Sequence, residues 1–461
     1  MPASNQHPTS RIQHPFLAAC LIVQAALLFW RLDLLPAWGD EYFTLDTSRQ
    51  PLAKIAAIVR GDIHPPLYYI LVHYWMQLPG PASLLVKARA FSGVWALAST
   101  VLLHRLWCRD ARFVLLWSLS PCLILYGRMG RSYTLQLFLG CLALYWGMSL
   151  VRDPRRRVAL WMYSASAALL LYTHYLPALA IILAVASFLF YRRAWIALAA
   201  PLAIMTLAYA PWLIDMQAAF GRVLHADPYA VTKHPILEQA IRLLYLPVSF
   251  TLGESVPTWV AIGGVLLAPA LAALLWRTLK QAPDWLPLVS LATLIGYVGA
   301  GRWVSFAFVP ARLLFALPFY LMLLARRTWI CAALACLWIG SLYSYFHLEN
   351  FLNKGYLLPF DDIARIIETE SPGPARLIID APGLDVSPLT RRLAHLMTAR
   401  PDVKFIWVLG SRGRRFEPAG TRPIRREDFI PYSRFDRYMM RLLDWDAQPT
   451  HALELTEYAT R

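Results

Sequence analysis

Two carboxylates stand side by side early in the chain, in the segment AWGDEYFTLD, where Glu41 directly follows Asp40. A long apolar run ends a few residues before them, so we expect both side chains just outside a membrane. Carboxylates at the edge of a hydrocarbon layer are costly to place, and those found there usually have a role. They can act as a general base for an acceptor hydroxyl or amine, or ligate a metal ion. The alternative interpretation is a solvated loop start whose charges mark the membrane edge.

A histidine on a constrained corner follows in the segment GDIHPPLYYILVHYW. The two consecutive prolines suit the first turn of a helix and keep His64 out of helical geometry, so His64 and Asp62 sit on a rigid corner at the membrane surface. We expect His64 at the depth of Asp40 and Glu41. There it can donate a hydrogen bond to a phosphate or share a divalent metal ion with the two carboxylates, and the sequence indicates no other cofactor. The aromatic residues that follow, Tyr68 among them, are typical of a belt at headgroup level.

Two arginines in the segment SPCLILYGRMGRSYTLQL, Arg128 and Arg131, stand three residues apart at the predicted outer end of an apolar span. Residues at that spacing point to similar faces of a helical turn. Paired guanidinium groups bind phosphate bidentately. The alternative is a pair of arginines that extend to the interface. Arginines are less common on the outer side of membrane proteins, which favours the functional interpretation.

Four further candidates for substrate binding are predicted on the outer side. His174 and Tyr175 occur in LYTHYLPAL between the fifth and sixth spans, Arg312 enters the tenth span in VSFAFVPARLLFALP, and Arg302 lies in the outer loop before it. A single histidine at a helix end is more often structural than catalytic. An arginine inside an apolar run needs a partner, so Arg312 is the stronger candidate of the four.

The elements that must position these residues are membrane helices. Of the 461 residues, 58% are hydrophobic and 16% are charged, against about 25% charged in soluble domains. This composition excludes an ordinary water-soluble enzyme and a disordered chain. A spanning helix needs about 20 mostly apolar residues. Eleven segments are predicted to span: 16–35, 86–106, 113–127, 132–150, 158–176, 177–191, 195–213, 257–276, 286–301, 311–325 and 328–346. The stretch 65–78 is too short and is predicted to lie in the interface.

The formal charge of +16 is distributed as a topological signal and not as a nucleic-acid-binding surface. With eleven spans, six alternate segments carry 14 basic and three acidic residues. The positive-inside rule assigns such segments to the cytoplasm. We therefore predict a cytoplasmic N-terminus, an outer location for the C-terminal part, and a site formed by the long outer loops 36–83 and 212–256.

The last part of the chain, residues 347–461, has 17 basic and 16 acidic residues and is predicted to be a soluble domain. Its segments 376–382 and 403–410 read as buried strands, with a helical pattern at 389–399 between them. We predict a small α/β domain built on a βαβ-like unit. No glycine-rich phosphate loop follows either strand.

The sequence resembles the polyprenyl-phosphate-sugar-dependent glycosyltransferases of the GT-C fold class. Within that class it is similar to family 39 and to bacterial proteins related to protein O-mannosyltransferases and lipid A aminoarabinose transferases. The matching segments are Asp40-Glu41, DIHPPLYY (62–69), RAFSG (89–93), YGRMGRSY (126–133), THY (173–175) and PARLLFALP (310–318). The resemblance covers most of residues 15–346. It implies a GT-C transmembrane domain at 1–346, with about eleven helices and a long first periplasmic loop.

The resemblance also implies a reaction. One sugar would move from a polyprenyl-phosphate donor to a lipid, glycan or protein acceptor on the outer face, usually with inversion. Asp40 is expected to act as general base or to orient the acceptor, with Glu41 beside it. Arg131 is expected to hold the donor phosphate or the shape of the site, and Tyr133 belongs to the same motif. A lipid phosphate that leaves needs cationic neutralisation more than protonation.

Two departures from the family pattern are visible. Relatives often have an acidic residue two positions before the arginine of the YGRMGRSY segment, where this chain has Met129. The chain also lacks the inserted β-trefoil domain of eukaryotic mannosyltransferases, which favours an enzyme of the bacterial inner membrane with a periplasmic C-terminal domain. Two alternatives remain open: a transporter or flippase of a lipid-linked anionic substrate, and a non-catalytic family member. Transporters usually show internal repeats and charges at the bilayer midplane, whereas the charges here gather on one face.

Overall fold

The computed structural model describes residues 10–61, 64–225, 235–303, 310–380, 386–399, 403–411, 416–429 and 453–460. The chain divides into two compact units. The helical unit comprises Met1–Leu32, Thr44–Asp227 and Leu244–Asn350. The C-terminal unit comprises Asp33–Phe43, Pro228–Leu243 and Phe351–Arg461. A short segment near the N-terminus therefore belongs with the C-terminal part of the chain.

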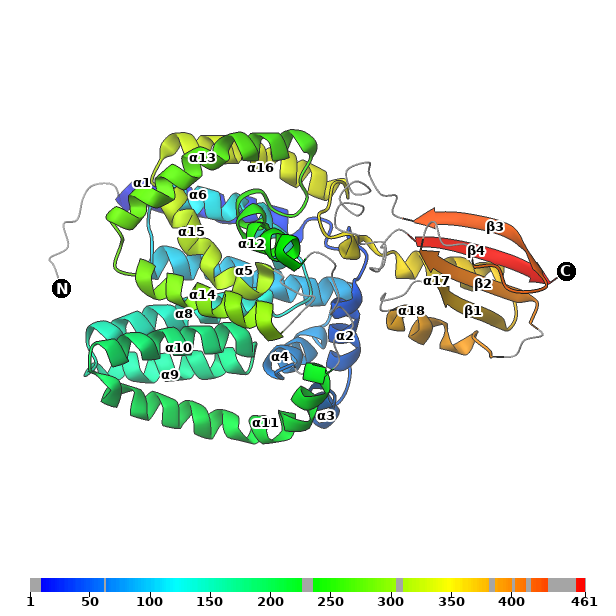
Figure 1. Ribbon diagram of the computed structural model, residues 1–461, viewed down its shortest axis with the longest axis horizontal. Helices are drawn as coiled ribbons and strands as arrows, with labels where there is room; N and C mark the ends of the chain where they lie inside the picture. The colour runs from blue at the N-terminus through cyan, green and yellow to red at the C-terminus, as the bar shows by residue number, and fades with distance from the viewer. Residues whose placement is uncertain are drawn as a thin grey trace. The chain divides into compact units, whose positions relative to one another are not determined.

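The helical unit is a bundle of apolar helices (Figure 1). Its helices are α1 (Ser10–Phe29), α3 (Leu52–Gly61), α4 (Leu67–Met76), α5 (Leu84–Leu106), α6 (Ala111–Leu119), α7 (Pro121–Gly127), α8 (Tyr133–Arg152), α9 (Arg157–Leu171), α10 (Tyr175–Tyr191), η1 (Trp195–Leu198), α11 (Ala199–His225), α12 (Pro235–Leu252), α13 (Thr258–Lys280), α14 (Leu286–Trp303), η2 (Pro310–Ala316), α15 (Leu317–Leu324) and α16 (Thr328–Phe346). Helix α2 (Gly39–Ser48) begins in the C-terminal unit and ends in the helical unit.

Each of the eleven predicted apolar segments coincides with a helix or with two successive helices. Within the described residues, five helices are long and apolar enough to cross a membrane, and five shorter apolar helices accompany them. These lengths agree with a multi-pass membrane protein. The exact number of spans stays a prediction.

Two of the predicted spans are broken rather than continuous. Segment 113–127 divides into α6 and α7 because Ser120 caps α7, accepting a hydrogen bond from the Leu123 amide, and Pro121 occupies its first turn. Proline has no amide hydrogen to extend the preceding helix. Segment 311–325 divides into η2 and α15 at a kink where Leu313 leaves helical geometry. Both breaks lie next to segments that carry candidate arginines.

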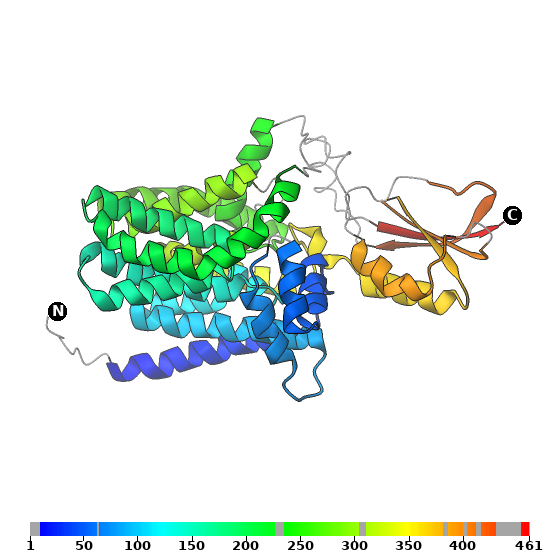
Figure 2. The same cartoon turned by 90° about the horizontal axis from the view of Figure 1, so that it is seen from below.

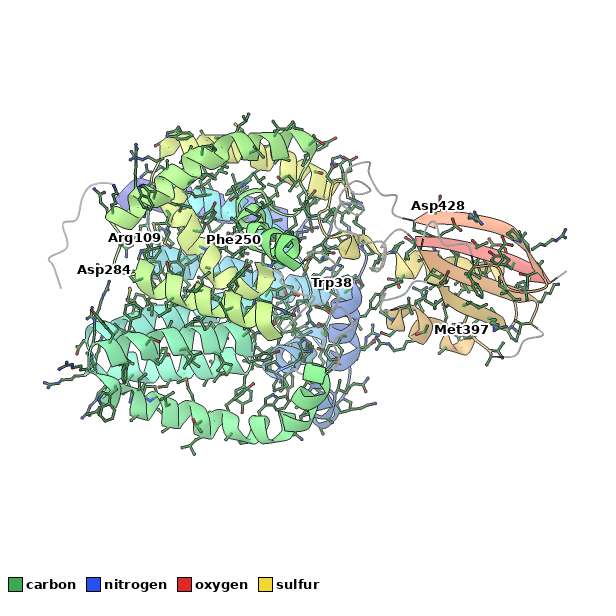
Figure 3. The ribbon with its side chains drawn as sticks, viewed as in Figure 1. Trp38, Arg109, Phe250, Asp284, Met397 and Asp428 are labelled. Carbon is green, nitrogen blue, oxygen red and sulfur yellow. The ribbon has the colours of Figure 1, made fainter. Side chains whose placement is uncertain are left out.

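Contacts within the helical unit group the predicted cytoplasmic segments at one end of the bundle. Arg152 forms an ion pair with Asp284 at 3.1 Å, and Arg192 donates to the Val151 carbonyl at 3.4 Å. Arg109 and Asp284 lie at this same end (Figure 3). The alternation predicted from the basic residues is therefore consistent with the fold, while the membrane side that this end faces stays a prediction.

The stretch 65–78 forms the short helix α4, which has ten residues. At a rise of about 1.5 Å per residue it is about 15 Å long, roughly half of the hydrocarbon thickness. It is too short to span, as expected. Its face with Tyr68, Tyr69, Val72 and Met76 is buried in the helical unit. The opposite face exposes Tyr74.

The C-terminal unit contains a sheet with strand order β1-β2-β4-β3. The strands are β1 (Ala375–Asp380), β2 (Phe405–Ser411), β3 (Thr421–Phe429) and β4 (Leu453–Thr460), and the helices are η3 (Lys354–Leu357), α17 (Phe360–Glu370), α18 (Ser387–Arg392) and η4 (Leu393–His395). β1 and β2 are parallel and flank α18, so the predicted βαβ unit is confirmed. β4 pairs antiparallel with both β2 and β3, which the sequence did not predict.

The core of this unit lies between the sheet and its two helices. α17 and α18 cover one face of the sheet (Figures 1 and 2). The buried cluster joins Phe360, Ile363 and Ile367 of α17 with Leu389 of α18 and Trp407 of β2. The apolar period of α17 matches a helix that buries one stripe against a sheet.

Candidate functional site

Arg131 is the centre of a polar cluster in the helical unit. It lies in the turn between α7 and α8 and is 5% exposed. One guanidinium nitrogen donates to Thr44 Oγ1 and to the Tyr69 hydroxyl, both at 3.2 Å. The other terminal nitrogen lies 3.1 Å from His64 Nε2. Two segments of the chain, α2 and the stretch 64–69 that leads into α4, therefore fix the orientation of this one guanidinium group.

The contact with Arg131 determines the tautomer of His64. A guanidinium group can only donate hydrogen bonds, so His64 Nε2 accepts in this contact and the ring proton resides on Nδ1. The ring also meets Tyr69 edge-on, with centroids 6.2 Å apart. As predicted, His64 stands just before the two prolines that precede α4 and is outside a helix. Asp62, predicted beside it, lies outside the described residues.

The backbone of this turn is held by a relay of hydroxyl groups. Ser92 Oγ donates to the Arg131 carbonyl at 3.0 Å, and the Tyr68 hydroxyl lies 2.9 Å from Ser92 Oγ. Since Ser92 uses its proton toward the carbonyl, Tyr68 is the donor to Ser92. Tyr68 is 1% exposed. It therefore supports the position of Arg131 rather than facing a ligand.

His174 lies in the turn between α9 and α10, outside both helices. Its Nδ1 accepts a hydrogen bond from the Leu176 amide at 3.3 Å and so caps α10. Burial, followed by the positive charge of Arg312 and by His64 and Arg131, holds the pKa of His174 well below its ordinary value. His174 is therefore neutral at pH 7. Because Arg312, His64 and Arg131 all act on the His174 ring, these side chains lie in the same region of the helical unit.

Arg312 lies in η2 and is partly buried. Its Nη1 is buried and has no hydrogen-bond partner within the described part of the chain. Gln136 on α8, which is 1% exposed, donates its amide to the carbonyl of the adjacent Ala311. Gln136 thus anchors the turn that carries Arg312. Sequence reasoning missed Gln136, because a glutamine inside an apolar helix was the only signal.

Arg128 has a different environment from the one predicted. It is 3% exposed, and its terminal nitrogens donate to the carbonyls of Leu27, Leu28, Trp30 and Arg31, at distances from 2.6 to 3.2 Å. Its Nε donates to the Tyr345 hydroxyl at 2.9 Å. These carbonyls belong to the C-terminal end of α1 and the residues just after it, where a cation is favourable. Arg128 fits a structural role better than phosphate binding.

The remaining predicted residues of the helical unit make aromatic contacts or lie outside the described side chains. Tyr133, 5% exposed, meets Tyr126 edge-on with centroids 5.5 Å apart. Tyr175 lies against the ring of His174 at 5.5 Å. The side chain of Arg302 lies outside the described residues. Met129 is 2% exposed and fills apolar space.

The carboxylate pair belongs to the C-terminal unit, in the first turn of α2. Negative charge is favourable at a helix N-terminus. Glu41 is fully buried, and its Oε2 accepts from the Trp38 amide at 3.4 Å, as in a capping contact. Asp40 is only partly buried. The two adjacent carboxylates therefore differ: Glu41 stabilises the turn, and Asp40 is the better candidate for chemistry.

A divalent metal near Asp40, Glu41 and His64 was one prediction. Among the described residues, which omit Asp62, no three His, Cys, Asp or Glu side chains gather so as to hold a metal ion. The described residues thus do not form a metal site, and the chemistry proposed below uses none.

No protein-family model and no curated protein matches the sequence. Solved structures do match. ArnT from Cupriavidus metallidurans in the apo state is 13% identical with a TM-score of 0.55, and the same protein bound to undecaprenyl phosphate is 14% identical with a TM-score of 0.52. Each match covers 98% of both chains.

The Archaeoglobus fulgidus oligosaccharyltransferase, in complex with Zn and sulfate, matches with a TM-score of 0.47 and 12% identity, over 85% of this chain and 67% of its own.

The ArnT likeness extends over both the helical and the C-terminal parts of the chain. The chain therefore has an ArnT-like fold, which confirms the GT-C architecture expected from the sequence resemblance.

Proposed function

We propose that this chain is a membrane glycosyltransferase that moves one sugar from a polyprenyl-phosphate donor to an envelope acceptor. The observation that carries the proposal is the gathering of Arg131, Arg312, His64 and His174 in the helical unit. Such a group suits a phosphate, whose negative charge Arg forks bind well. The ArnT-like fold supports this choice, since ArnT has been crystallised with undecaprenyl phosphate.

In the proposed reaction, an acceptor hydroxyl or amine attacks the anomeric carbon of the donor sugar. The bond between that carbon and the phosphate oxygen breaks, and its electron pair leaves on the lipid phosphate. The attacking group loses its proton to Asp40. Arg131 and Arg312 neutralise the charge that develops on the leaving phosphate, which is the larger requirement of this chemistry. A single displacement of this kind inverts the anomeric centre.

His64 and His174 assist as neutral groups. The proton on His64 Nδ1 and the proton on His174 Nε2 are hydrogen-bond donors that cost no additional positive charge near the arginines. The proposed setting is the outer face of a bacterial inner membrane, with the C-terminal domain in the periplasm. The acceptor is a lipid, a glycan or a protein.

The first test uses the purified chain in nanodiscs, with undecaprenyl phosphate as the probe and undecaprenol as the control that lacks the phosphate. We expect undecaprenyl phosphate alone to raise the melting temperature. A shift of equal size with both lipids would contradict a phosphate site.

The second test measures transfer. The protein is incubated with polyprenyl-phosphate sugars and envelope extract, and mass spectrometry follows the release of polyprenyl phosphate and the gain of sugar on an acceptor. Asp40→Asn should lower the rate by about 100-fold or more, while Asp284→Asn, whose carboxylate pairs with Arg152 among the predicted cytoplasmic segments, should not. Full transfer by Asp40→Asn would exclude Asp40 as the base. Movement of the lipid across a bilayer without release of the sugar would favour a flippase.

A further inference from the structure

The segment that carries the carboxylates packs against the C-terminal domain, although more than 300 residues separate them in the sequence. The Trp38 ring meets the ring of Tyr356 edge-on, with centroids 5.3 Å apart. Tyr42 packs against the core cluster that α17, α18 and the sheet build. Tyr356 is 2% exposed, so the contact with Trp38 lies inside the fold and not on its surface.

In the sequence, Trp38 and Tyr42 lie on either side of Asp40 and Glu41. The Tyr42 amide donates to the Trp38 carbonyl at 3.1 Å, which places these residues one helical turn apart. Residues two apart on a helix point in roughly opposite directions, about 200° around the axis. With Tyr42 directed into the C-terminal core, Asp40 is directed away from it. The partial burial of Asp40 agrees with this orientation.

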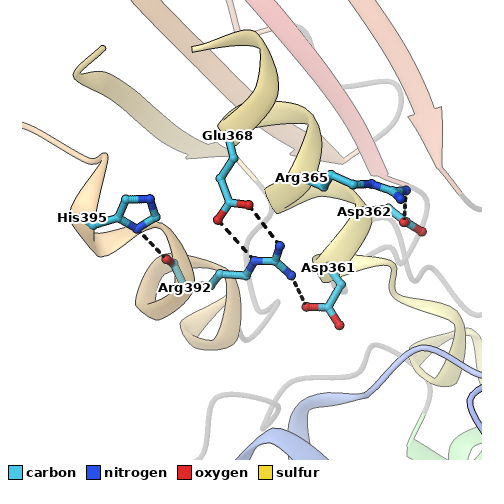
Figure 4. Close-up of polar contacts among 6 residues, drawn as sticks. All are labelled: Asp361, Asp362, Arg365, Glu368, Arg392 and His395. Atoms are coloured by element: carbon cyan, nitrogen blue, oxygen red, sulfur yellow. Dashed lines mark hydrogen bonds and ion pairs between the residues drawn. The ribbon is translucent and has the colours of Figure 1, made fainter. Parts of the chain in front are cut away.

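A charge network lies beside the Tyr42 phenol. The Tyr42 hydroxyl is buried and faces the Asp361 carboxylate without a hydrogen bond of standard geometry. Asp361 of α17 accepts from Arg392 Nη1 at 2.6 Å. Arg392 of α18 also donates to both carboxylate oxygens of Glu368, at 3.0 and 3.3 Å (Figure 4). Burial, and then Asp361, raise the pKa of Tyr42, so the phenol stays neutral.

We propose that the C-terminal domain is the positioning element for the carboxylate pair: the core of α17, α18 and the sheet holds Tyr42, Tyr356 of η3 holds Trp38, and together they fix the direction of Asp40. Tyr42 is a positioning residue in this scheme, and it touches no reacting atom. The proposal deepens the proposed function, on which it rests for the role of Asp40. It gives the C-terminal domain a part in the reaction although no substrate site is assigned to it.

The test compares full-length variants in two measurements. Tyr42→Ala should lower kcat by about 100-fold, the size expected when a reacting group shifts by about 1 Å, with KM for the polyprenyl-phosphate donor unchanged within about two-fold. Tyr42→Phe keeps the ring and should retain most of the activity. Arg392→Gln removes the cation between Asp361 and Glu368 and should give an intermediate loss. Arg365→Gln is the matched control, because within the described residues Arg365 pairs with Asp362 alone, on the exposed side of α17 (Figure 4).

The second measurement, hydrogen exchange of the backbone amides of residues 39–48, does not depend on activity. We expect faster exchange there in Tyr42→Ala and Arg392→Gln, and no change in Arg365→Gln. Unchanged kcat in Tyr42→Ala, or a lower kcat without faster exchange, would overturn the positioning role. If the wild-type chain transfers no sugar, the proposed function fails, and exchange alone then decides: faster exchange supports the docking of residues 33–43, and unchanged exchange refutes it.

Discussion

Arg128 and Arg131 stand three residues apart in one turn, yet they are directed toward different regions of the helical unit. The guanidinium group of Arg128 meets backbone carbonyls at the end of α1 and the hydroxyl of Tyr345. That of Arg131 meets side chains: a threonine, a tyrosine and a histidine. The first set of partners belongs to the fold. The second set consists of side-chain groups, so the two arginines differ in the kind of partner that holds them.

Burial alone would not separate the two. They are 3% and 5% exposed, and both are costly to place in an apolar setting without compensation. The Arg128 region uses its charge to satisfy carbonyls that α1 leaves unpaired at its C-terminal end. The Arg131 region gathers a second arginine and two imidazoles instead. Mutations in the two regions should therefore change different measured quantities.

The largest expected effect is that of Arg131→Gln on transfer. Loss of a charge-assisted contact to the leaving phosphate should lower kcat/KM by about 100- to 1,000-fold, with the melting temperature changed by only a few degrees. Arg131→Lys keeps the charge but not the planar fork and should recover part of the rate. Steady-state kinetics and thermal unfolding of the same preparations provide both quantities. Arg105→Gln, on an exposed arginine of α5, is the control. If Arg131→Gln lowers the melting temperature as much as Arg128→Gln does, the loss of rate reflects unfolding, and the two arginines do not differ in role.

The next effect is that of Arg128→Gln on stability. Several buried carbonyls lose their donor together, which should cost about 3 kcal/mol. We expect a clear drop in melting temperature in detergent, while the protein that remains folded transfers at a rate within about three-fold of wild type. Arg128→Lys should be intermediate, since one ammonium group cannot reach all of the carbonyls. A variant of wild-type stability that has lost transfer would instead assign Arg128 to the donor phosphate.

Much of the fold was predictable because its signals are local. A run of apolar residues indicates a helix without information from distant parts of the chain. Each of the eleven predicted segments coincides with one helix or two. The breaks at Ser120-Pro121 and at Leu313 were missed because apolar content does not reveal a cap or a kink inside a run. Strand β3 was missed for another reason. The sequence of β3, TRPIRREDF, is largely exposed and charged, so it lacks the apolar alternation of a buried strand.

The site was predictable only in its residue types. The motif that contains Arg128 and Arg131 marks both alike, and the difference arises from carbonyls about a hundred residues earlier in the chain. Tyr42 packs against a core whose residues lie more than 300 positions later in the chain. Contacts at such separations leave no trace in local spacing. The sequence can therefore nominate residues for a site but cannot say which of them the fold has already engaged.

A smaller effect is expected from Gln136→Leu, which tests how Arg312 joins the Arg131 region. The change removes the amide that donates to the Ala311 carbonyl, so η2 can shift and take Arg312 with it. We expect kcat/KM to fall by about 10-fold, the cost of one misplaced charged contact. Gln24→Leu is the matched control, because Gln24 is an equally buried glutamine whose partner is Thr100. Equal kinetic losses in both variants would reduce Gln136 to a packing role.

The smallest effect concerns His174 and pH. Its pKa in the folded chain is held well below the ordinary value, which is about 6.5 in an unfolded chain. The unfolded state therefore binds a proton first as the pH falls, and the stability that neutral His174 contributes is present above pH 6.5 and lost below it. The loss should be about 1 kcal/mol per pH unit just below 6.5. Melting temperatures between pH 8 and pH 5 check this against His174→Asn, which can still cap α10 but does not titrate. The wild-type curve should fall more steeply than that of the variant. Parallel curves would mean that the pKa of His174 is the same in the folded and the unfolded chain, and the fold would then not hold this side chain neutral.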